Sequence, residues 1–473
     1  MSVSSAFSPA TPTFTAGDNV PVRSYCLGAW GGLTEGVTRA DSANRPNAVV
    51  RLRYLKLSAF HQALRMLLKR HTVLNTRLAG RDGVPWICPN VSTDLNVRVL
   101  NIGPRETLEA RADAERILGQ LVWEPFDYLE GPLYRAFAVK AGDEYYVGLV
   151  VHHFVADAIS ISLLMRELTQ LHDAASRRQI ARLAPINLRY QDYLRGIDAW
   201  ISSNDGLEAR RAVQRGLVGG AAAEFETASP ADNDHQYFIM DRTVAESVRQ
   251  LARGLGTSVF TVLLAAQNVV AAPRTATQST ILKIITTGRE LSSLTPIVGN
   301  MADRIYVATD ISGDPSFPEL IMRTHAAVNR CRKLAFVRAD FVQADMNQAG
   351  LSTAAPVFNF RSARRGAQPM ETPLPNDAAP PLAVPPAQIG QVTRPRDAYY
   401  LEIVDDGRDL WGSVKYGQGR IDNFLVALEE VLRIGILRTD APLSDLVRAA
   451  EGGGETREHD QRRRTQHLVP QAI

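Results

Sequence analysis

The residues best suited to chemistry in this sequence are two adjacent histidines followed by an aspartate. The stretch from Val150 to Ser160 reads VVHHFVADAIS, so Asp157 lies four residues after His153. An imidazole changes its charge near neutral pH, so a neutral histidine can take a proton from an incoming amine or alcohol. Asp157 lies close enough along the chain to fix the loop as a structural carboxylate.

The pattern around the two histidines predicts a strand before them and a helix after them. Residues from Tyr145 to Val151 are mostly β-branched, aromatic or apolar, which favours a strand. A helical spacing of apolar residues follows, at Ile161, Leu164, Leu168 and Leu171. If the strand continues through His152 and His153, alternation places them on opposite faces, so that one meets the core and the other a cleft.

The remaining periodicity predicts an α/β chain in two halves, with residues 174–184 as the polar linker between them. In the first half we predict strands at 49–57, 133–139 and 145–151, a helix capped by Ser58, and a helix at 107–118. In the second half we predict helices at 244–253, 259–272, 317–334 and 423–434, with strands at 281–286 and 304–308. Residues 1–18 are expected to form a flexible arm, 369–395 an irregular proline-rich loop, and 449–473 a disordered tail.

The composition argues against several classes of protein. Lys and Arg number 53 and Asp and Glu 50, so the net charge of +3 gives no reason to expect a nucleic-acid partner. Cys26, Cys88 and Cys331 are an odd number without a CxxC pair, which predicts neither a disulfide framework nor a metal site. The chain shows no signal-peptide pattern and no apolar stretch long enough to span a bilayer, so we expect a cytoplasmic protein with no membrane partner.

The stretch HHFVADAIS resembles the HHxxxDG motif of the condensation domains of nonribosomal peptide synthetases. The wider superfamily includes chloramphenicol acetyltransferase and polyketide-associated acyltransferases. Further stretches resemble other motifs of the family and follow in the same order: RHTVLNTRL at 70–78, EPFD at 124–127, GPLYR at 131–135, YQDY at 190–193, GRE at 288–290, IVGNM at 297–301 and PVFNF at 356–360. Chance would not produce this order. Because the stretches are spread along the sequence, the resemblance covers most of the chain.

The resemblance implies a fold with two chloramphenicol acetyltransferase-like lobes, arranged as a V-shaped pseudo-dimer around a central active-site tunnel. The N-terminal lobe would span residues 19–180 and the C-terminal lobe residues 181–448. By the same likeness, His153 would be the catalytic base and His152 would help to hold the loop. Asp157 would be structural and paired with an arginine from the second lobe, for which Arg289 is the candidate.

The resemblance also implies a reaction, in which a stand-alone enzyme transfers an acyl chain from a carrier-protein thioester to an amine or hydroxyl acceptor. An acyl or peptidyl carrier protein would supply the phosphopantetheine arm in trans, so the enzyme itself would bind no cofactor and no metal. The absence of a GxSxG elbow favours direct transfer. Backbone amides or a hydroxyl near the loop would stabilise the oxyanion. Ser160 is a weak candidate for this donor and a better one for a helix N-cap, and Ala158 keeps a small residue where the motif has glycine.

Some departures from the family pattern leave other functions open. The usual Asn-Thr after IVGNM is missing, which favours a specialised acceptor. A coenzyme A-dependent acyltransferase acting on a lipid or small alcohol shares the same motif and is the first alternative. A non-catalytic recruitment platform is the second, although such domains commonly lose the histidines that this chain keeps. Epimerisation lacks a further acid–base signature, and heterocyclisation is disfavoured because the motif begins with His and not Asp.

Overall fold

The computed structural model describes most of the chain between residues 46 and 452, together with Val20–Pro21. The gaps in this range fall at 82–83, 91–93, 103–112, 114–115, 123, 224–225, 228–234, 276, 292–293, 351, 353, 363–396, 417–418 and 421–423. The predicted N-terminal arm, the proline-rich loop and residues 453–473 of the predicted tail therefore lie outside the described residues. The described residues 449–452, which we assigned to the tail, belong to helix α13 (Leu443–Gly452).

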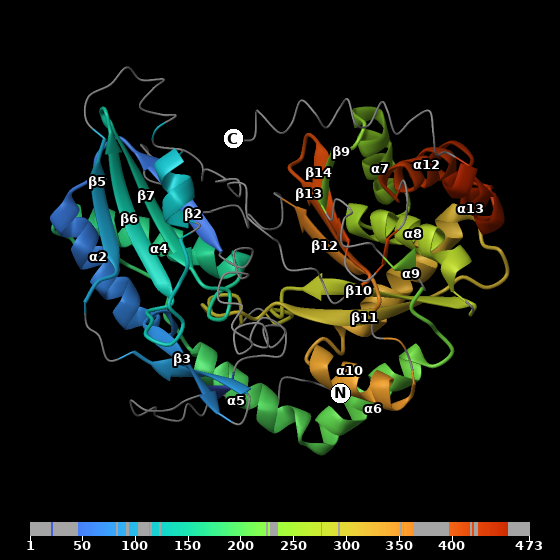
Figure 1. The fold of residues 1–473 in the computed structure, drawn as a ribbon, viewed down its shortest axis with the longest axis horizontal. Helices are drawn as coiled ribbons and strands as arrows, with labels where there is room; N and C mark the ends of the chain where they lie inside the picture. Colours follow the sequence, from blue (N-terminus) through green and yellow to red (C-terminus); the bar gives the residue numbers. More distant parts are fainter. Residues whose placement is uncertain are drawn as a thin grey trace.

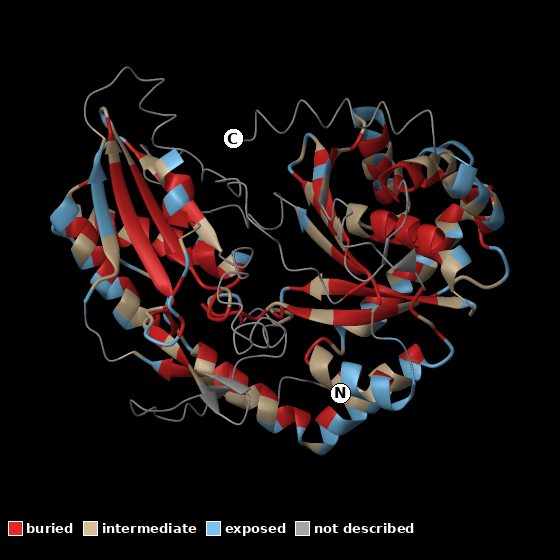
Figure 2. Cartoon of the chain, in the orientation of Figure 1, coloured by how far each residue is buried: buried red, intermediate tan, exposed pale blue. Residues whose placement is uncertain are grey.

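Two α/β lobes stand as the arms of a V, and helices α5 (Tyr190–Ile201) and α6 (Asn204–Leu217) run along the side where the arms meet (Figure 1). Each lobe contains a sheet backed by helices, and the buried residues concentrate in the strands and the helix faces against them (Figure 2). The predicted two-lobed α/β architecture is confirmed. The central tunnel remains a prediction.

The first lobe is built on a four-stranded sheet with the order β2-β7-β6-β5. These strands are β2 (Asn47–Leu52), β5 (Val97–Asn101), β6 (Tyr134–Ala141) and β7 (Glu144–Val151). β6 and β7 are buried over most of their length, and for this reason their sequences are nearly continuous apolar runs. A smaller sheet joins β1 (Val20–Pro21), β4 (Val84–Pro89) and β3 (Thr76–Arg81), and a short 3₁₀ helix, η3 (Thr72–Leu74), precedes β3.

Helices α2 (Leu57–Arg70) and α4 (Ala158–Ser176) are held together by a charged cluster at the end of α2. Arg70 donates to Glu167 from Nε at 2.9 Å and from a second guanidinium nitrogen at 3.2 Å. The Nε2 atom of His71 lies 2.6 Å from the same carboxylate. Burial alone would raise the pKa of Glu167, but hydrogen bonds and charge from His71 and then Arg70 outweigh it and hold this pKa below its ordinary value. The RHTVLNTRL stretch therefore packs α2 against the helix that follows the two histidines.

Replacing Glu167 with glutamine is expected to lower the free energy of unfolding by about 3 kcal/mol at neutral pH, because it leaves the partly buried guanidinium of Arg70 without its carboxylate and weakens the short contact with His71. The pKa of Glu167 is lower in the folded state than its ordinary value of 4.5, so the ionised carboxylate stabilises the fold fully at a pH above 4.5. This stabilisation is lost as the pH falls through the pKa of the folded state. The stability difference between wild type and Glu167→Gln should therefore shrink in urea unfolding below that pH. A difference that stayed constant with pH would contradict the role given to this carboxylate.

The second lobe contains a six-stranded sheet with the order β11-β10-β12-β13-β14-β9. Its strands are β9 (His235–Ile239), β10 (Ser279–Thr286), β11 (Asp303–Asp310), β12 (Val357–Ser362), β13 (Tyr399–Asp405) and β14 (Leu410–Tyr416). The helices of its core are α7 (Arg242–Gly254), α8 (Val259–Ala271), α9 (Phe317–Arg332) and α12 (Phe424–Leu437), with α13 beside α12. The short elements are η4 (Ala272–Arg274), β8 (Glu226–Thr227) and β15 (Gly419–Arg420). Helix α8 is buried from Thr261 to Ala271, as its mostly apolar sequence predicts.

The core of the first lobe continues into the second. Ile281 of β10, Met301, and Tyr306 of β11 belong to the same apolar cluster as β6 and β7. Helices α5, α6 and α10 (Ala339–Gln348) also contribute to this cluster, and α6 packs against α10 and β11. The predicted boundary near residue 180 falls between α4 and α5, although the linker assigned to 174–184 begins inside α4.

Two local predictions in the first lobe are wrong. Strand β2 ends at Leu52 rather than at Leu57, and helix α2 begins at Leu57, so Ser58 is already inside the helix. The first helical hydrogen bond runs from the amide of Phe60 to the carbonyl of Lys56, at 2.9 Å. Lys56 is thus the N-cap and makes no side-chain cap, which explains why the capping signal pointed to the wrong residue.

Among the described residues, no single helix is long and apolar enough to cross a membrane. The pair formed by α7 and the segment Val259–Arg274 meets the length and composition criteria only when the two are taken together, and they are bent by 108° at their junction.

Candidate active site

His153 lies in the turn that follows β7 and is half-buried. Its Nδ1 atom lies 2.7 Å from the carbonyl oxygen of Ala156. A carbonyl only accepts hydrogen bonds, so the contact places the ring proton on Nδ1 and the lone pair on Nε2. The turn thus fixes the orientation and the tautomer of the ring in the form that a general base requires.

His152 is almost completely buried and packs inside an aromatic cage. Its ring centroid lies 4.8 Å from that of Tyr128, 4.5 Å from that of Phe154 and 5.8 Å from that of Phe126. Its Nδ1 atom accepts a hydrogen bond from the amide of Phe154 at 3.2 Å. His152 is buried and His153 is half-buried, so the two histidines differ in exposure as expected. The cause is not strand alternation, because β7 ends at Val151 and both histidines lie in the turn that follows it.

The EPFD and GPLYR stretches support this cage. Arg135 of β6 donates to the carbonyls of Leu121 at 2.8 Å, Glu124 at 3.2 Å and Pro125 at 3.1 Å. Its guanidinium also lies 4.8 Å from the ring centroid of Phe126. Since Phe126 contacts His152, this buried arginine fixes the wall behind the histidine turn.

Asp157 is the N-cap of α4, and its two oxygens face different parts of the molecule. Oδ1 accepts hydrogen bonds from the amide and the hydroxyl of Ser160, both at 2.8 Å. Oδ2 accepts from the amide of Met301 at 3.1 Å and from the guanidinium of Arg289. Asp157 and Arg289 belong to different lobes, so this carboxylate joins the histidine turn to the second lobe.

The structure brings Arg289 and Asp157 together as a buried ion pair whose side chains are 3% and 5% exposed. Burial by itself would raise the pKa of Asp157, but the charge of Arg289 and hydrogen bonds from Arg289 and Ser160 hold it below its ordinary value. Arg289 also donates to the carbonyl of Ile297 at 3.0 Å. The pair therefore stays ionised and orients the loop, a role distinct from proton transfer.

Ser160 occupies the centre of the contact between the lobes. Its hydroxyl donates to Asp157 and lies 2.9 Å from the carbonyl of Gly299, accepts from the Gly299 amide at 3.0 Å, and lies 3.1 Å from a nitrogen of Arg289. The expectation that Ser160 caps the helix is wrong, because Asp157 is the cap and Ser160 lies in the first turn. Its side chain is fully buried in these contacts, which argues against a role as an oxyanion donor. Ala158 is exposed at the first position of α4.

Two glycines permit close packing of the segments of the second lobe that face Asp157. Gly288 has a φ of +66°, and a Cβ at this position would lie 1.9 Å from the carbonyl oxygen of Met301. A Cβ at Gly299 would lie 2.1 Å from the ring of Tyr190, whose hydroxyl donates to the carbonyl of Asn300 at 2.7 Å. The GRE, IVGNM and YQDY stretches therefore meet at one point beside Asp157.

Replacing Gly299 with alanine is expected to lower the free energy of unfolding by about 1–3 kcal/mol, because the new methyl group overlaps the Tyr190 ring. The matched control is Gly216→Ala in α6, where a Cβ would meet nothing within 4 Å. Alanine should stabilise that helix by up to about 1 kcal/mol. Chemical denaturation of both variants checks the prediction, which fails if both glycines tolerate alanine equally.

Sequence reasoning did not identify the amide of Met301, the backbone of Gly299 or the hydroxyl of Tyr190 as parts of the site. Each lies within a stretch that had been recognised by its likeness to a family motif. Backbone amides and carbonyls are present in nearly every residue, so residue type alone does not indicate which of them belong to the site. Identifying them requires knowing which of these stretches lie side by side in the fold. The order of the stretches along the chain was the available signal.

Within the described ranges, no group of three or more His, Cys, Asp or Glu side chains is arranged to hold a metal ion. The chemistry that this site can perform with its own groups is proton transfer by His153 beside a rigid, ion-paired loop.

Comparison with known proteins gives the same family as the motifs. The family model described as the condensation domain matches residues 38–362. A linear gramicidin synthase of Brevibacillus parabrevis is 31% identical over 293 residues, which cover 59% of this chain and 4% of that protein. The chain thus spans only a small part of the length of this relative.

Solved structures confirm the fold. The X-domain from teicoplanin biosynthesis superposes with a TM-score of 0.69 at 18% identity, covering 95% of this chain and 98% of the other. The epimerization domain from the third module of tyrocidine synthetase B gives a TM-score of 0.67 at 14% identity, covering 93% and 99%. With the family match over more than half of its residues, the chain belongs to the condensation-domain family.

Proposed function

We propose that this chain is a condensation enzyme that transfers an acyl group from a phosphopantetheinyl carrier-protein thioester to an amine or hydroxyl acceptor. The observation that carries the proposal is the 2.7 Å contact between Nδ1 of His153 and the carbonyl of Ala156, which leaves Nε2 able to take a proton. The buried ion pair between Asp157 and Arg289 supports it, because a rigid loop holds the base in one position.

The reaction then needs three events. Nε2 of His153 takes the proton of the acceptor as its nitrogen or oxygen attacks the thioester carbonyl, forming a tetrahedral oxyanion. The oxyanion collapses, the carbon–sulfur bond breaks, and the departing thiolate receives the proton. We propose the amides of Ala158 and Ile159, at the start of α4, as the donors that stabilise the oxyanion, since the amide of Ser160 already donates to Asp157. The thioester and its phosphopantetheine arm belong to the carrier, so the enzyme needs no cofactor of its own for these steps.

Intact-mass spectrometry of an acyl-loaded carrier protein tests the proposal. The carrier is incubated with the enzyme and a panel of amines and alcohols, and the expected result is loss of the acyl mass from the carrier and appearance of an amide or ester conjugate. Turnover of acyl-coenzyme A but not of the carrier would instead establish the coenzyme A-dependent alternative. Binding of the carrier without any transfer would overturn the proposal in favour of a recruitment platform, and inversion of a carrier-bound aminoacyl centre would show epimerisation.

A further inference from the structure

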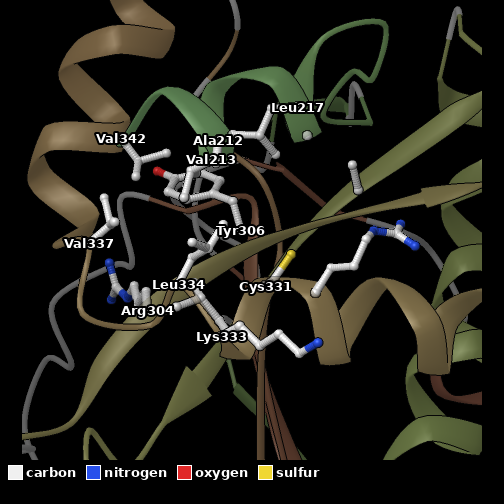
Figure 3. Close-up of a pocket in the computed structure, with 14 residues that line it drawn as sticks. Ala212, Val213, Leu217, Arg304, Tyr306, Cys331, Lys333, Leu334, Val337 and Val342 are labelled. Atoms are coloured by element: carbon white, nitrogen blue, oxygen red, sulfur yellow. The ribbon is translucent and has the colours of Figure 1, made fainter. Parts of the chain in front are cut away.

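A cavity of about 340 Å³ lies in the second lobe, outside the histidine turn and the Asp157–Arg289 contact (Figure 3). It lies between helix α6, strand β11, the C-terminal end of α9 and helix α10. Its apolar walls come from Ala212, Val213, Leu217, Ala308, Leu334, Val337 and Val342. The volume is in the range of small-molecule sites and equals the space of about eleven waters in the liquid.

Strand alternation and small residues explain why this space is open. β11 is an edge strand, and its residues Ile305 and Val307 pack in the core of the second lobe. Arg304, Tyr306 and Ala308 line the cavity on the side of α6 and α10, and Ile305 also borders it. Ala212 and Gly216 on α6 contribute little or no side chain opposite this strand, and a Cβ at Gly216 would meet nothing within 4 Å. The cavity is therefore open because α6 has small residues where it faces β11.

Ion pairs hold the helical walls of the cavity in position, whether or not the cavity is occupied. Arg210 of α6 binds the carboxylate of Asp345 on α10 through two nitrogens, with Nε at 2.7 Å. The same guanidinium lies 5.0 Å from the ring centroid of Phe341. Arg338, before α10, donates to Asp198 of α5 at 2.8 Å. The walls are thus preformed, which lowers the entropic cost of binding a ligand.

The charged side chains that line the cavity are all cationic: Arg304, Arg330 and Lys333. Arg304 lies at one end beside Val337, while Lys333 extends outward from the rim (Figure 3). Among the described residues, Arg330 and Lys333 form no ion pair within 4.0 Å. Arg304 lies 3.4 Å from Asp397, but a guanidinium has five N–H donors and can bind a second carboxylate at the same time.

The acidic groups in the walls stay uncharged. Burial raises the pKa of the Tyr306 phenol above its ordinary value, and it raises the pKa of the Cys331 thiol to about 11 despite the opposing charge of Arg330. No carboxylate lines the cavity among the residues assigned to it. An anion would therefore contact cations and neutral groups in the lining, while the Asp397 carboxylate next to Arg304 is also paired with Lys283 at 2.6 Å. The thiol of Cys331 would be mostly protonated at neutral pH and would react slowly.

We propose that this cavity binds a small amphipathic carboxylate, with its apolar body against α6 and α10 and its carboxylate at Arg304. The apolar walls select the body, since apolar surface removed from water is the main source of affinity. The cationic end selects an acid over the corresponding alcohol or amine. The site goes beyond acyl transfer at His153 and shares none of the residues given to that reaction.

Calorimetric titration with three probes of equal chain length, octanoate, 1-octanol and octylammonium, tests the inference on the whole chain. Octanoate is expected to bind at one saturable site, with an affinity at least tenfold higher than that of 1-octanol. Octylammonium should bind more weakly than 1-octanol. Arg304→Gln should weaken octanoate binding at least tenfold, and Ala212→Trp should abolish it by filling the cavity. Asp397 keeps its 2.6 Å contact with Lys283 in the Arg304 variant, so no buried carboxylate is left alone.

The matched control is Arg215→Gln, an exposed arginine of α6 that does not line the cavity and should leave binding unchanged. A second measurement uses the wild type alone: octanoate should slow alkylation of Cys331 severalfold, measured by peptide mass, and should not change alkylation of buried Cys88. Equal affinity for octanoate and 1-octanol would overturn the proposal. So would unchanged octanoate binding by Ala212→Trp, or alkylation of Cys331 at the same rate with and without octanoate.

Discussion

Replacing His153 with alanine is expected to lower kcat for acyl transfer by roughly 10²–10⁴-fold, the usual contribution of a positioned general base. Carrier binding should change little, because the imidazole acts on the acceptor proton. The reason is the tautomer fixed by the carbonyl of Ala156, which places the lone pair of the neutral ring on Nε2. Single-turnover transfer from a loaded carrier, measured by intact mass, gives the rate directly.

The control for this variant is His325→Ala. His325 lies on α9 in the second lobe, where its Nδ1 is 2.9 Å from the hydroxyl of Thr257 and its Nε2 is 2.8 Å from the side-chain amide of Asn329. Its replacement removes an imidazole without touching the histidine turn, so the transfer rate should stay at the wild-type value. If His153→Ala folds normally and transfers as fast as the wild type, His153 is not the base.

Replacing Asp157 with asparagine is expected to lower the free energy of unfolding by about 3–5 kcal/mol, because it leaves the guanidinium of Arg289 as a buried charge without its partner. Asparagine keeps the size of the side chain and can still accept from Ser160, so the effect reports on charge rather than on volume. Urea unfolding at neutral pH gives the difference. Since the pKa of Asp157 is depressed in the fold, the difference should narrow as the pH falls through that value.

A double variant separates the ion pair from the rest of the contact. Asp157→Asn combined with Arg289→Met removes both charges and should recover part of the stability lost in the single variant. Glu208→Gln, which breaks the exposed pair with Arg215, should leave the melting temperature unchanged. The assignment would be wrong if the double variant were as unstable as the sum of its two single variants, since the two charges would then be independent.

The sequence was sufficient for elements with a strong local pattern. β6 and β7 are nearly continuous apolar runs separated by a Gly-containing turn, and α8 is mostly apolar, so each was predicted to within two residues. The motif stretches also indicated which distant segments belong to one fold. Arg289 was proposed as a partner of Asp157 from family likeness, and the structure places the two side chains in contact.

Other elements left little signal in the sequence. α6 buries only Gly206 and Leu217, so it has no apolar stripe, and α10 buries only Val342 and Met346. β13 did carry a usable alternation in Tyr399, Leu401 and Ile403, which we did not assign. The error at Ser160 has a different cause. Whether a serine caps a helix or enters its first turn depends on where the backbone bends, and here Asp157 competes for the same role.

The contact of Asp157 with Arg289 and the Met301 amide joins residues that are 132 and 144 positions apart. A nascent chain that has emerged only as far as α4 already contains both histidines, yet it lacks the guanidinium and the amide that the aspartate needs. The turn can therefore reach its final geometry only after the second lobe has been synthesised and has folded against the first. In the proposed reaction, competence to take a proton would then be acquired late, at the last stage of assembly, and an incomplete chain would not consume loaded carriers.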